Sequence, residues 1–253
     1  MRYVRYLRDG QPRHGIIEQE RVLEIEAPGE KTVRFTGRSY EISDLELLAP
    51  VMPGKVIGVG LNYKDHIAEL NHQIPDEPLL FLKPPSSVIG TNMHIIYPGI
   101  SKRVDFEAEL AVVIGEACRH VSPREALKKV WGYTCGNDVT ARDLQTRDGQ
   151  WTRAKSFHTF CPLGPWIETD IDPGNLRITA RVNGEIRQHS NTNQMLFPVE
   201  ELVAFVSKVM TLTPGDVILT GTPSGVGPLE VGDEISIEIE GIGVLRNTVI
   251  AGP

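Results

Sequence analysis

Two glutamates one residue apart, Glu107 and Glu109, are the first residues in this sequence whose spacing could support chemistry. They lie in the run Val104–Ile114, which we expect to form a strand. Alternate side chains of a strand share a face, so both carboxylates should project together, opposite Ala108 and Leu110. The apolar residues that follow indicate that the strand enters the interior, where a divalent cation with oxygen ligands would neutralise the two acids. The alternative is a solvated acidic face on an exposed edge strand.

A third carboxylate follows the predicted strand Tyr133–Cys135. Asp138 lies in Gly136–Asp143 and could supply a third oxygen ligand. The Asn-Asp pair is equally a turn signal, so this residue alone does not decide between the two interpretations.

A histidine and a glutamate three residues apart, His66 and Glu69, share one face of a predicted helix over residues 62–70. A histidine oriented by a carboxylate is a general-base arrangement. The alternative is an ordinary surface pair on an amphipathic helix.

Two lysines lie at positions where a cation could act on an anionic substrate. Lys83 ends the apolar run Leu79–Leu82, and Lys155 lies within residues 153–157. Each could bind an anion or stabilise an enolate. Each could equally extend its amine to solvent.

The glycine-rich segment Thr220–Gly227 follows a predicted strand. It lacks the lysine of a phosphate-binding loop and no helix signal follows it, which argues against nucleotide binding. Its backbone amides could bind a substrate carboxylate, and a plain tight turn is the alternative.

The elements that position these residues are mostly strands. After residue 54 we expect strands at Lys55–Val59, Leu79–Leu82, Glu107–Ile114, Tyr133–Cys135, Arg177–Val182, Val217–Leu219, Glu234–Glu240 and Val244–Ile250. Helices are expected at residues 62–70 with Asn62 as N-cap, from Ser122 as N-cap to about Val130, and over Pro198–Met210. Many strands with few helices in irregular order exclude a simple βαβ repeat, so the predicted class is α+β, mostly β.

The first 50 residues read as a separate small unit. Asp9-Gly10 is a hairpin signal between Tyr3–Arg8 and Gly15–Glu18, and Val22–Ile25 is a further strand. Ala49–Gly54 contains two prolines and a glycine and is predicted to be a linker. We therefore expect a small N-terminal β-rich domain over residues 1–50 and a catalytic domain over residues 51–253.

Composition limits the classes of partner and compartment. The net charge of -7 argues against a nucleic-acid surface, which needs basic side chains to displace counterions. The three cysteines form no CxxC pair and are too few for a disulfide framework, so a zinc-thiolate site is not expected. Arginines interrupt the N-terminus and no apolar run approaches the ~18 residues of a membrane helix. The sequence therefore predicts a cytoplasmic protein that binds neither nucleic acid nor membrane.

The ordered set of motifs resembles the catalytic domain of the fumarylacetoacetate hydrolase family from about residue 55 to the C-terminus. The motifs are Asn62-Tyr63-x-x-His66-x-x-Glu69, Phe81-Leu82-Lys83-Pro84, Phe106-Glu107-x-Glu109-Leu110, Asn137–Gln145, Gln150–Phe157, Cys161–Pro165 and Leu219–Gly227. One departure is His158, where relatives often carry Asp. The resemblance implies a mixed-sheet β-roll, commonly a homodimer.

The resemblance also implies roles for individual residues. Glu107, Glu109 and Asp138 would hold a metal, usually Mg²⁺, with Mn²⁺ or Ca²⁺ as other candidates. His66 and Glu69 would be a water-activating dyad on a mobile lid at about residues 62–76, whose far end is made polar by Asn71, Gln73 and Pro75-Asp76. Lys155 would lie beside the substrate oxyanion. Thr222 would lie near a substrate carboxylate. Arg142, Gln145 and Lys83 would contact either the substrate or the side chains that bind it.

The implied activity is enolate chemistry on a small 2-oxo acid. Magnesium prefers six oxygen ligands, so three carboxylates leave about three positions for a chelating 2-oxo acid. The leading expectation is a hydrolase that cleaves a C–C bond of an acylpyruvate- or fumarylacetoacetate-like acid, with a place in aromatic catabolism. The alternatives are an isomerase or tautomerase of a hydroxyheptadienedioate type, an oxaloacetate decarboxylase, and a non-enzymatic metal- or ligand-binding protein.

Overall fold

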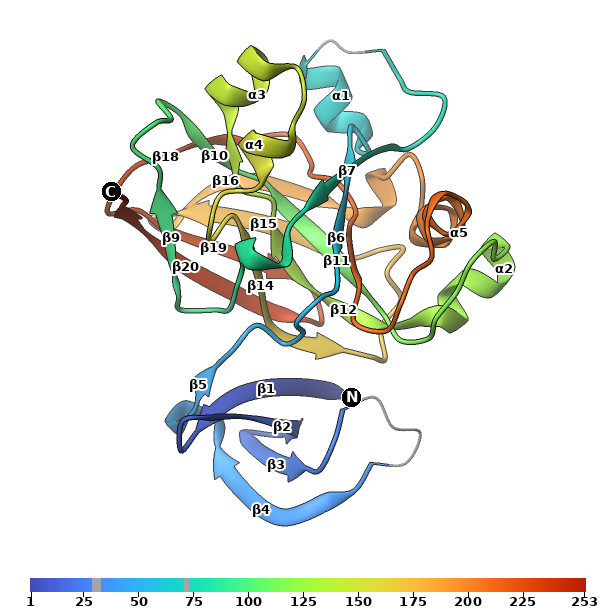
Figure 1. Ribbon diagram of the computed structural model, residues 1–253, viewed down its shortest axis with the longest axis vertical. Helices are drawn as coiled ribbons and strands as arrows, with labels where there is room; N and C mark the ends of the chain where they lie inside the picture. Colours follow the sequence, from blue (N-terminus) through green and yellow to red (C-terminus); the bar gives the residue numbers. More distant parts are fainter. Residues whose placement is uncertain (29–32, 71–72) are drawn as a thin grey trace.

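The computed structural model describes residues 1–28, 33–70 and 73–253 (Figure 1). Four antiparallel strands open the chain: β1 (Arg2–Arg8), β2 (Gln11–Glu18), β3 (Arg21–Ile25) and β4 (Phe35–Glu41). The turn between β1 and β2 has positive φ at Asp9 (51°) and Gly10 (70°), as the hairpin signal requires. A 3-10 turn over Ile42–Asp44 and the short strand β5 (Glu46–Leu47) precede the irregular segment Ala49–Gly54.

These strands continue into the main sheet, because β1 pairs with β14 through Arg2↔Glu168 and Tyr3↔Ile167. The sheet has twelve strands, in the order β4-β3-β2-β1-β14-β12-β11-β17-β6-β7, with β5 on β1 and β8 on β14. Its later members are β14 (Cys161–Glu168), β12 (Val130–Asn137), β11 (Ala108–Ile114), β17 (Val217–Leu219), β6 (Val56–Gly60), β7 (Leu79–Lys83) and β8 (Val88–Ile89). The sheet is mixed, since β17 runs parallel to β6 while β11 is antiparallel to both neighbours.

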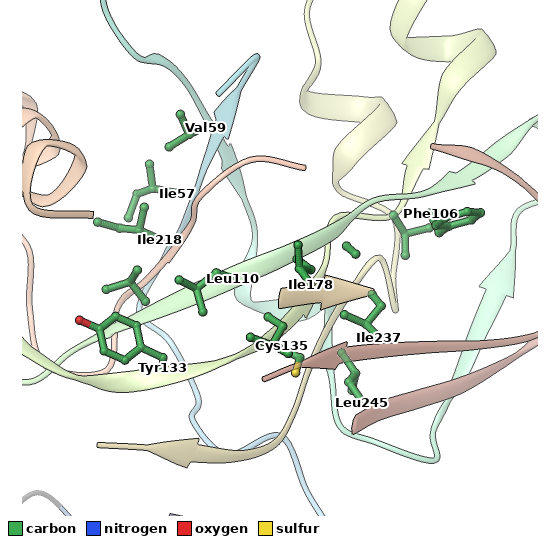
Figure 2. Packing of buried hydrophobic residues seen from close by; sticks show 14 of the residues in the cluster. Ile57, Val59, Phe106, Leu110, Tyr133, Cys135, Ile178, Ile218, Ile237 and Leu245 are labelled. Carbon is green, nitrogen blue, oxygen red and sulfur yellow. The ribbon is translucent and has the colours of Figure 1, made fainter. Parts of the chain in front are cut away.

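Two smaller sheets complete the fold. One has the order β16 (Glu185–Asn191), β15 (Arg177–Val182), β19 (Glu234–Ile239), β20 (Gly243–Ala251) and β9 (His94–Tyr97). The other joins β13 (Thr140–Ala141), β10 (Val104–Phe106) and β18 (Gly227–Leu229). The core lies between the main and five-stranded sheets, where Leu110 and Cys135 meet Ile178, Ile237 and Leu245 (Figure 2).

The helices are short and lie at the periphery (Figure 1). They are α1 (Lys64–Leu70), α2 (Pro123–Ala126), α3 (Arg142–Asp148), α4 (Thr152–Lys155) and α5 (Val199–Val209), with 3-10 turns at Pro85–Ser87, Leu127–Lys129 and Thr192–Gln194. Helix α5 buries its apolar stripe as predicted, with Pro198 and Met210 as its caps. Among the described residues, no helix is long and apolar enough to cross a membrane.

The predicted class is confirmed: the fold is α+β, mostly β, with mixed sheets. One local prediction was wrong. Asn62 does not cap α1, because its side chain bonds the Thr220 carbonyl (2.7 Å) and the backbone of Phe197. Ser122 is the N-cap residue of α2 as predicted, although its side chain makes no cap bond.

Candidate metal centre and active site

Glu107 lies where the chain passes from one sheet to another. Strand β10 belongs to the three-stranded sheet and β11 to the main sheet, and Glu107 is the single residue between them. Glu109 follows inside β11, opposite Gly136 of β12. Both glutamates are buried, at 6% and 1% exposure. Because β11 is paired on both sides and wholly buried, the alternative of an exposed edge strand is excluded.

Asp138 completes a cluster of three buried carboxylates. It follows β12 directly, and its amide donates to the Glu107 carbonyl (2.9 Å). One ligand oxygen from each of Glu107, Glu109 and Asp138 lies within 4.8 Å of the others. The β11–β12 register, with Ala108 opposite Asn137, is what brings the third acid beside the first two.

Three cations contact two of these acids. Lys155 Nζ donates to Glu107 Oε2 (2.8 Å) and to Asp138 Oδ2 (2.5 Å). Lys83 Nζ donates to Asp138 Oδ1 (2.6 Å) and to the Val139 carbonyl. Arg142 donates to Glu107 Oε1. Both lysines are buried, so neither extends to solvent.

Glu109 has a different environment from Glu107. Burial would raise the pKa of Glu107, but Lys155 and Arg142 outweigh burial and hold that pKa well below its ordinary value. For Glu109, burial and the carboxylates of Asp138 and Glu107 raise the pKa well above its ordinary value. Its side chain accepts one hydrogen bond among the described residues, from the Gly221 amide (2.6 Å). A buried acid without a cationic contact, beside two further oxygen donors, fits a divalent cation with a preference for oxygen ligands.

The carboxylates open into a cleft of about 520 Å³. Phe81 and Trp151, whose rings meet edge to face with centroids 5.4 Å apart, form an apolar wall. The predicted residues that line the same cleft are His66, Glu107, Glu109, Asp138, Arg142, Gln145, Lys155 and Thr222. The cleft is therefore large enough for a small acid that contacts the metal ligands and His66 together.

The predicted dyad, His66 and Glu69, lies on α1. His66 Nδ1 is 3.2 Å from Glu69 Oε2. His66 is 6% exposed and lines the cleft, whereas the Glu69 side chain is 40% exposed, so only the histidine of the pair is buried. Glu69 also accepts from the Gly225 amide (3.1 Å), and Asp65 accepts from Ser190 (2.6 Å), so α1 is attached to two other segments. The predicted lid covers about residues 62–76, of which residues 71–72 lie outside the described residues, and its closure stays a prediction.

The glycine-rich segment uses two of its amides on protein carboxylates. Gly221, at a φ of 97°, donates to Glu109, and Gly225, at a φ of 92°, donates to Glu69. Thr222 and Val226 of this segment line the cleft, and Thr222 is the one of the two with a polar side chain. The segment thus joins the metal ligands to the dyad.

Two further residues lie away from their expected surroundings. Lys83 is 1% exposed and sits behind Asp138 rather than on the cleft wall. His158 is exposed and its Nδ1 is 3.1 Å from the Ser86 carbonyl, outside the cleft lining. Among the described residues, no hydrogen bond or ion pair joins His158 to Lys155.

Several cleft residues were not predicted from the sequence. Arg103 and Asp105 line the cleft, and the fully buried Asp105 accepts from Arg103 Nε (2.9 Å) and Arg142 Nε (2.9 Å). Trp151 and Phe81 lay within quoted motifs, yet their role as a wall depends on the β6–β7 pairing and on α4, which begins directly after Trp151 and ends at Lys155. An acid between two apolar residues, as in Val104-Asp105-Phe106, was the available signal for Asp105.

Two known family descriptions together match most of the chain. Residues 55–250 match the family described as Fumarylacetoacetate (FAA) hydrolase C-terminal, and residues 1–50 match the family described as Rv2993c-like, N-terminal. The chain is 50% identical over 220 residues to the mitochondrial oxaloacetate tautomerase Fahd2a of Rattus norvegicus, covering 82% of this chain and 70% of that protein.

Solved structures are similar over the full length. The 5-carboxymethyl-2-hydroxymuconate delta-isomerase from Mycobacterium smegmatis is 47% identical, with a TM-score of 0.94 and 100% coverage of both chains. The maleylpyruvate hydrolase from Sphingobium sp. SYK-6, solved in complex with manganese (II) ion and pyruvate, is 30% identical, with a TM-score of 0.84 and 100% coverage of both.

Proposed function

The chain belongs to the fumarylacetoacetate hydrolase family of enzymes, and we propose that it is a magnesium-dependent isomerase or tautomerase of a small 2-oxo or enolisable dicarboxylic acid such as oxaloacetate. The observation that carries the proposal is the cleft that places three buried carboxylates and Lys155 opposite the His66–Glu69 pair. Relatives named as tautomerase and isomerase are 50% and 47% identical to this chain, whereas two relatives named as hydrolases are 38% and 30% identical. The similarity therefore favours proton transfer over hydrolysis.

The metal would be held by Glu107, Glu109 and Asp138. A divalent cation bound there would supply Lewis-acid polarisation of the substrate's 2-oxo oxygen. Magnesium suits an all-oxygen donor set, and manganese or calcium has the same ligand preference. Three carboxylates leave coordination positions for the two oxygens of a 2-oxo acid.

Lys155 would stabilise negative charge that develops on the 2-oxo oxygen. Burial would lower the pKa of Lys155, but Asp138 and Glu107 outweigh burial and raise it, so the amine stays protonated at neutral pH. Its charge is therefore available as a fixed electrostatic partner within the cleft. The 2% exposure of Lys155 keeps water from screening that charge.

His66 would move the proton between the enol oxygen and a carbon of the substrate. Its ring lines the cleft and Glu69 contacts Nδ1, which leaves Nε2 to face a substrate carbon. Tautomerisation needs only this transfer, since no bond to water forms. Hydrolysis of an acylpyruvate needs the same base to activate a water, so hydrolysis is the second candidate and the similarity to the maleylpyruvate hydrolase supports it.

A substrate panel with magnesium separates the candidates. We expect the purified protein to accelerate enol–keto conversion of oxaloacetate, or isomerisation of a 2-hydroxymuconate-type acid, at least about tenfold more efficiently than acylpyruvate hydrolysis. Hydrolysis as the only detectable reaction would contradict the isomerase assignment.

A histidine variant tests the role of the dyad on the same panel. His66→Gln should lower proton transfer and hydrolysis by about 10²–10⁴-fold. Decarboxylation of oxaloacetate, which needs the metal and Lys155 but no base, should suffer much less. The matched control is His158→Gln, an exposed histidine outside the cleft, which should retain wild-type rates. Equal losses in both variants would contradict the role of His66.

The family resemblance and the sequence further lead us to propose a homodimer in the cytoplasm. Light scattering of the purified protein should give about twice the chain mass of 28.0 kDa. A mass of one chain would contradict the homodimer.

A further inference from the structure

A buried glutamine outside every predicted motif connects the metal-ligand strand to Thr222. Gln188 lies in β16 and is 0% exposed. Its Oε1 accepts from the amide of Ala108, the residue between Glu107 and Glu109, at 2.9 Å. Its Nε2 donates to Thr222 Oγ1 and to the Pro223 carbonyl, each at 2.8 Å.

These partners fix which end of the amide faces which group. The Ala108 amide can only donate and the Pro223 carbonyl can only accept, so Oε1 and Nε2 cannot exchange places. Nε2 uses its two hydrogens on Thr222 and Pro223. The Thr222 oxygen is therefore an acceptor in this contact, and its own proton must be donated elsewhere.

The Thr222 hydroxyl proton can point into the cleft. Thr222 lines the cleft, and in the described part of the chain no protein group accepts its proton. The preceding residue, Gly221, donates its amide to Glu109, so Thr222 lies directly beside the metal ligands. A substrate oxygen next to the metal is the acceptor that this geometry leaves open.

The backbone of β16 is shaped to make this connection. The β15–β16 register pairs Ala180 with Gln188 and Arg181 with Ile186, which leaves Arg187 as a bulge. Bulges re-aim neighbouring side chains. Gly225 packs against this bulge so closely that a Cβ there would lie 2.2 Å from the Arg187 carbonyl oxygen.

We infer that Gln188 is a positioning residue for the reaction. It orients the Thr222 hydroxyl as a hydrogen-bond donor to the substrate carboxylate beside the metal. The inference rests on the proposed function for the presence of that carboxylate. It assigns Gln188 no contact with the substrate itself. It predicts that Gln188 and Thr222 act as one unit.

Oxalate binding to the magnesium-loaded protein tests this unit by calorimetry. Gln188→Met removes the amide at nearly the same volume, and Thr222→Val removes the hydroxyl. Each should weaken oxalate about tenfold, the loss expected for one hydrogen bond to a charged group. The double variant should be no weaker than Thr222→Val within about twofold, because the same bond cannot be lost twice. Thr222→Ser, which keeps the hydroxyl, should bind oxalate like the wild type.

Magnesium binding without oxalate distinguishes this inference from a role of Gln188 in holding the metal-ligand strand in place, because such a role would change the magnesium affinity. The inference predicts magnesium affinity within about twofold of wild type in Gln188→Met. A loss of about tenfold there would overturn it, because Gln188 would then act through Ala108 on the ligand strand. Additive losses of oxalate affinity, near 100-fold in the double variant, would also overturn it. So would an absence of oxalate binding by the magnesium-loaded wild type.

A second substitution keeps the inference testable if Gln188→Met does not fold. Gln188→Glu retains an acceptor for the Ala108 amide but turns the Thr222 proton toward the new carboxylate. Oxalate should again bind at least about tenfold more weakly, and unchanged binding would overturn the inference. Turnover of isomerase substrates is measured separately, so failure of the proposed function leaves these binding ratios intact.

Discussion

Neutralising Glu109 should stabilise the metal-free protein while abolishing its metal site. Glu109→Gln keeps an oxygen for the Gly221 amide and places a donor among the other two carboxylates. Two unit charges 4.8 Å apart repel by about 3–4 kcal/mol at an effective dielectric constant of about 20. Attraction to Lys155 and the ability of Glu109 to bind a proton offset part of this repulsion. We therefore expect a net gain of about 2 kcal/mol in the free energy of unfolding.

The matched substitution Glu107→Gln should have the opposite effect. Glu107 contacts Lys155 and Arg142, so losing its charge leaves two buried cations short of a partner. Removing one member of a buried ion pair costs about 3–5 kcal/mol. In EDTA, thermal unfolding should therefore shift up by about 4–8 °C for Glu109→Gln and down by about 6 °C or more for Glu107→Gln.

Two further conditions sharpen the comparison. Magnesium at about 100 times its Kd should stabilise the wild type by about 2.7 kcal/mol and neither variant. Because the folded pKa of Glu109 is raised, its contribution is intact below the unfolded pKa of about 4.3 and is lost as pH rises. The advantage of Glu109→Gln should therefore shrink toward pH 4. An equal loss of stability in both variants in EDTA, or a gap independent of pH, would refute the reasoning.

Three other predictions follow from the same structure. Calorimetric titration with magnesium should show one site per chain, and undiminished binding in a Glu107→Ala, Glu109→Ala double variant would contradict the ligand assignment. Amide exchange over residues 62–70 should slow when oxalate and magnesium are added; no change with oxalate shown to be bound would rule out a closing lid. Burial raises the pKa of Cys135 and Cys161 to about 12, so both thiols should resist a disulfide reagent at pH 8 in the native protein and react after unfolding; rapid native reaction would contradict their burial.

Local patterns in the sequence predicted several elements close to their observed bounds. Val217–Leu219 and Arg177–Val182 match β17 and β15, and the apolar stripe of residues 198–210 matches α5. These predictions succeed because the spacing of apolar residues along the chain follows the side chains that are buried. Asn62 illustrates the limit: its type suits a helix cap, but the pairing of distant loops uses its side chain for Thr220 and Phe197.

The candidate site was predictable as a set of residues and only partly as an arrangement. The alternation of Glu107 and Glu109 indicated a shared face, and the structure shows both buried. The chain order did not reveal that Lys155 and Arg142 both contact Glu107 and that neither contacts Glu109. This difference in contacts is why the pKa of Glu107 is lowered and the pKa of Glu109 is raised. Gln188 carried no local signal, because its role depends on a register bulge and on contacts with residues 80 and 34 positions away.

The division of the chain at about residue 50 stays a prediction. The first four strands form their own antiparallel set, yet β1 extends the main sheet through its pairing with β14. A linker predicted from Pro and Gly content says nothing about such pairing, because strand partners are set by contacts distant in sequence.

The proposed role of a divalent cation on the three carboxylates, to promote proton transfer on a 2-oxo acid, can be measured directly. The measurement is the rate of enol–keto conversion of oxaloacetate, followed by ultraviolet absorbance, with metal-stripped protein, with magnesium restored, and with Glu109→Gln. We expect catalysis that disappears with EDTA, returns with magnesium, and is absent from Glu109→Gln at every magnesium concentration. Full catalysis by the metal-stripped wild type, or by Glu109→Gln, would contradict this role of the metal.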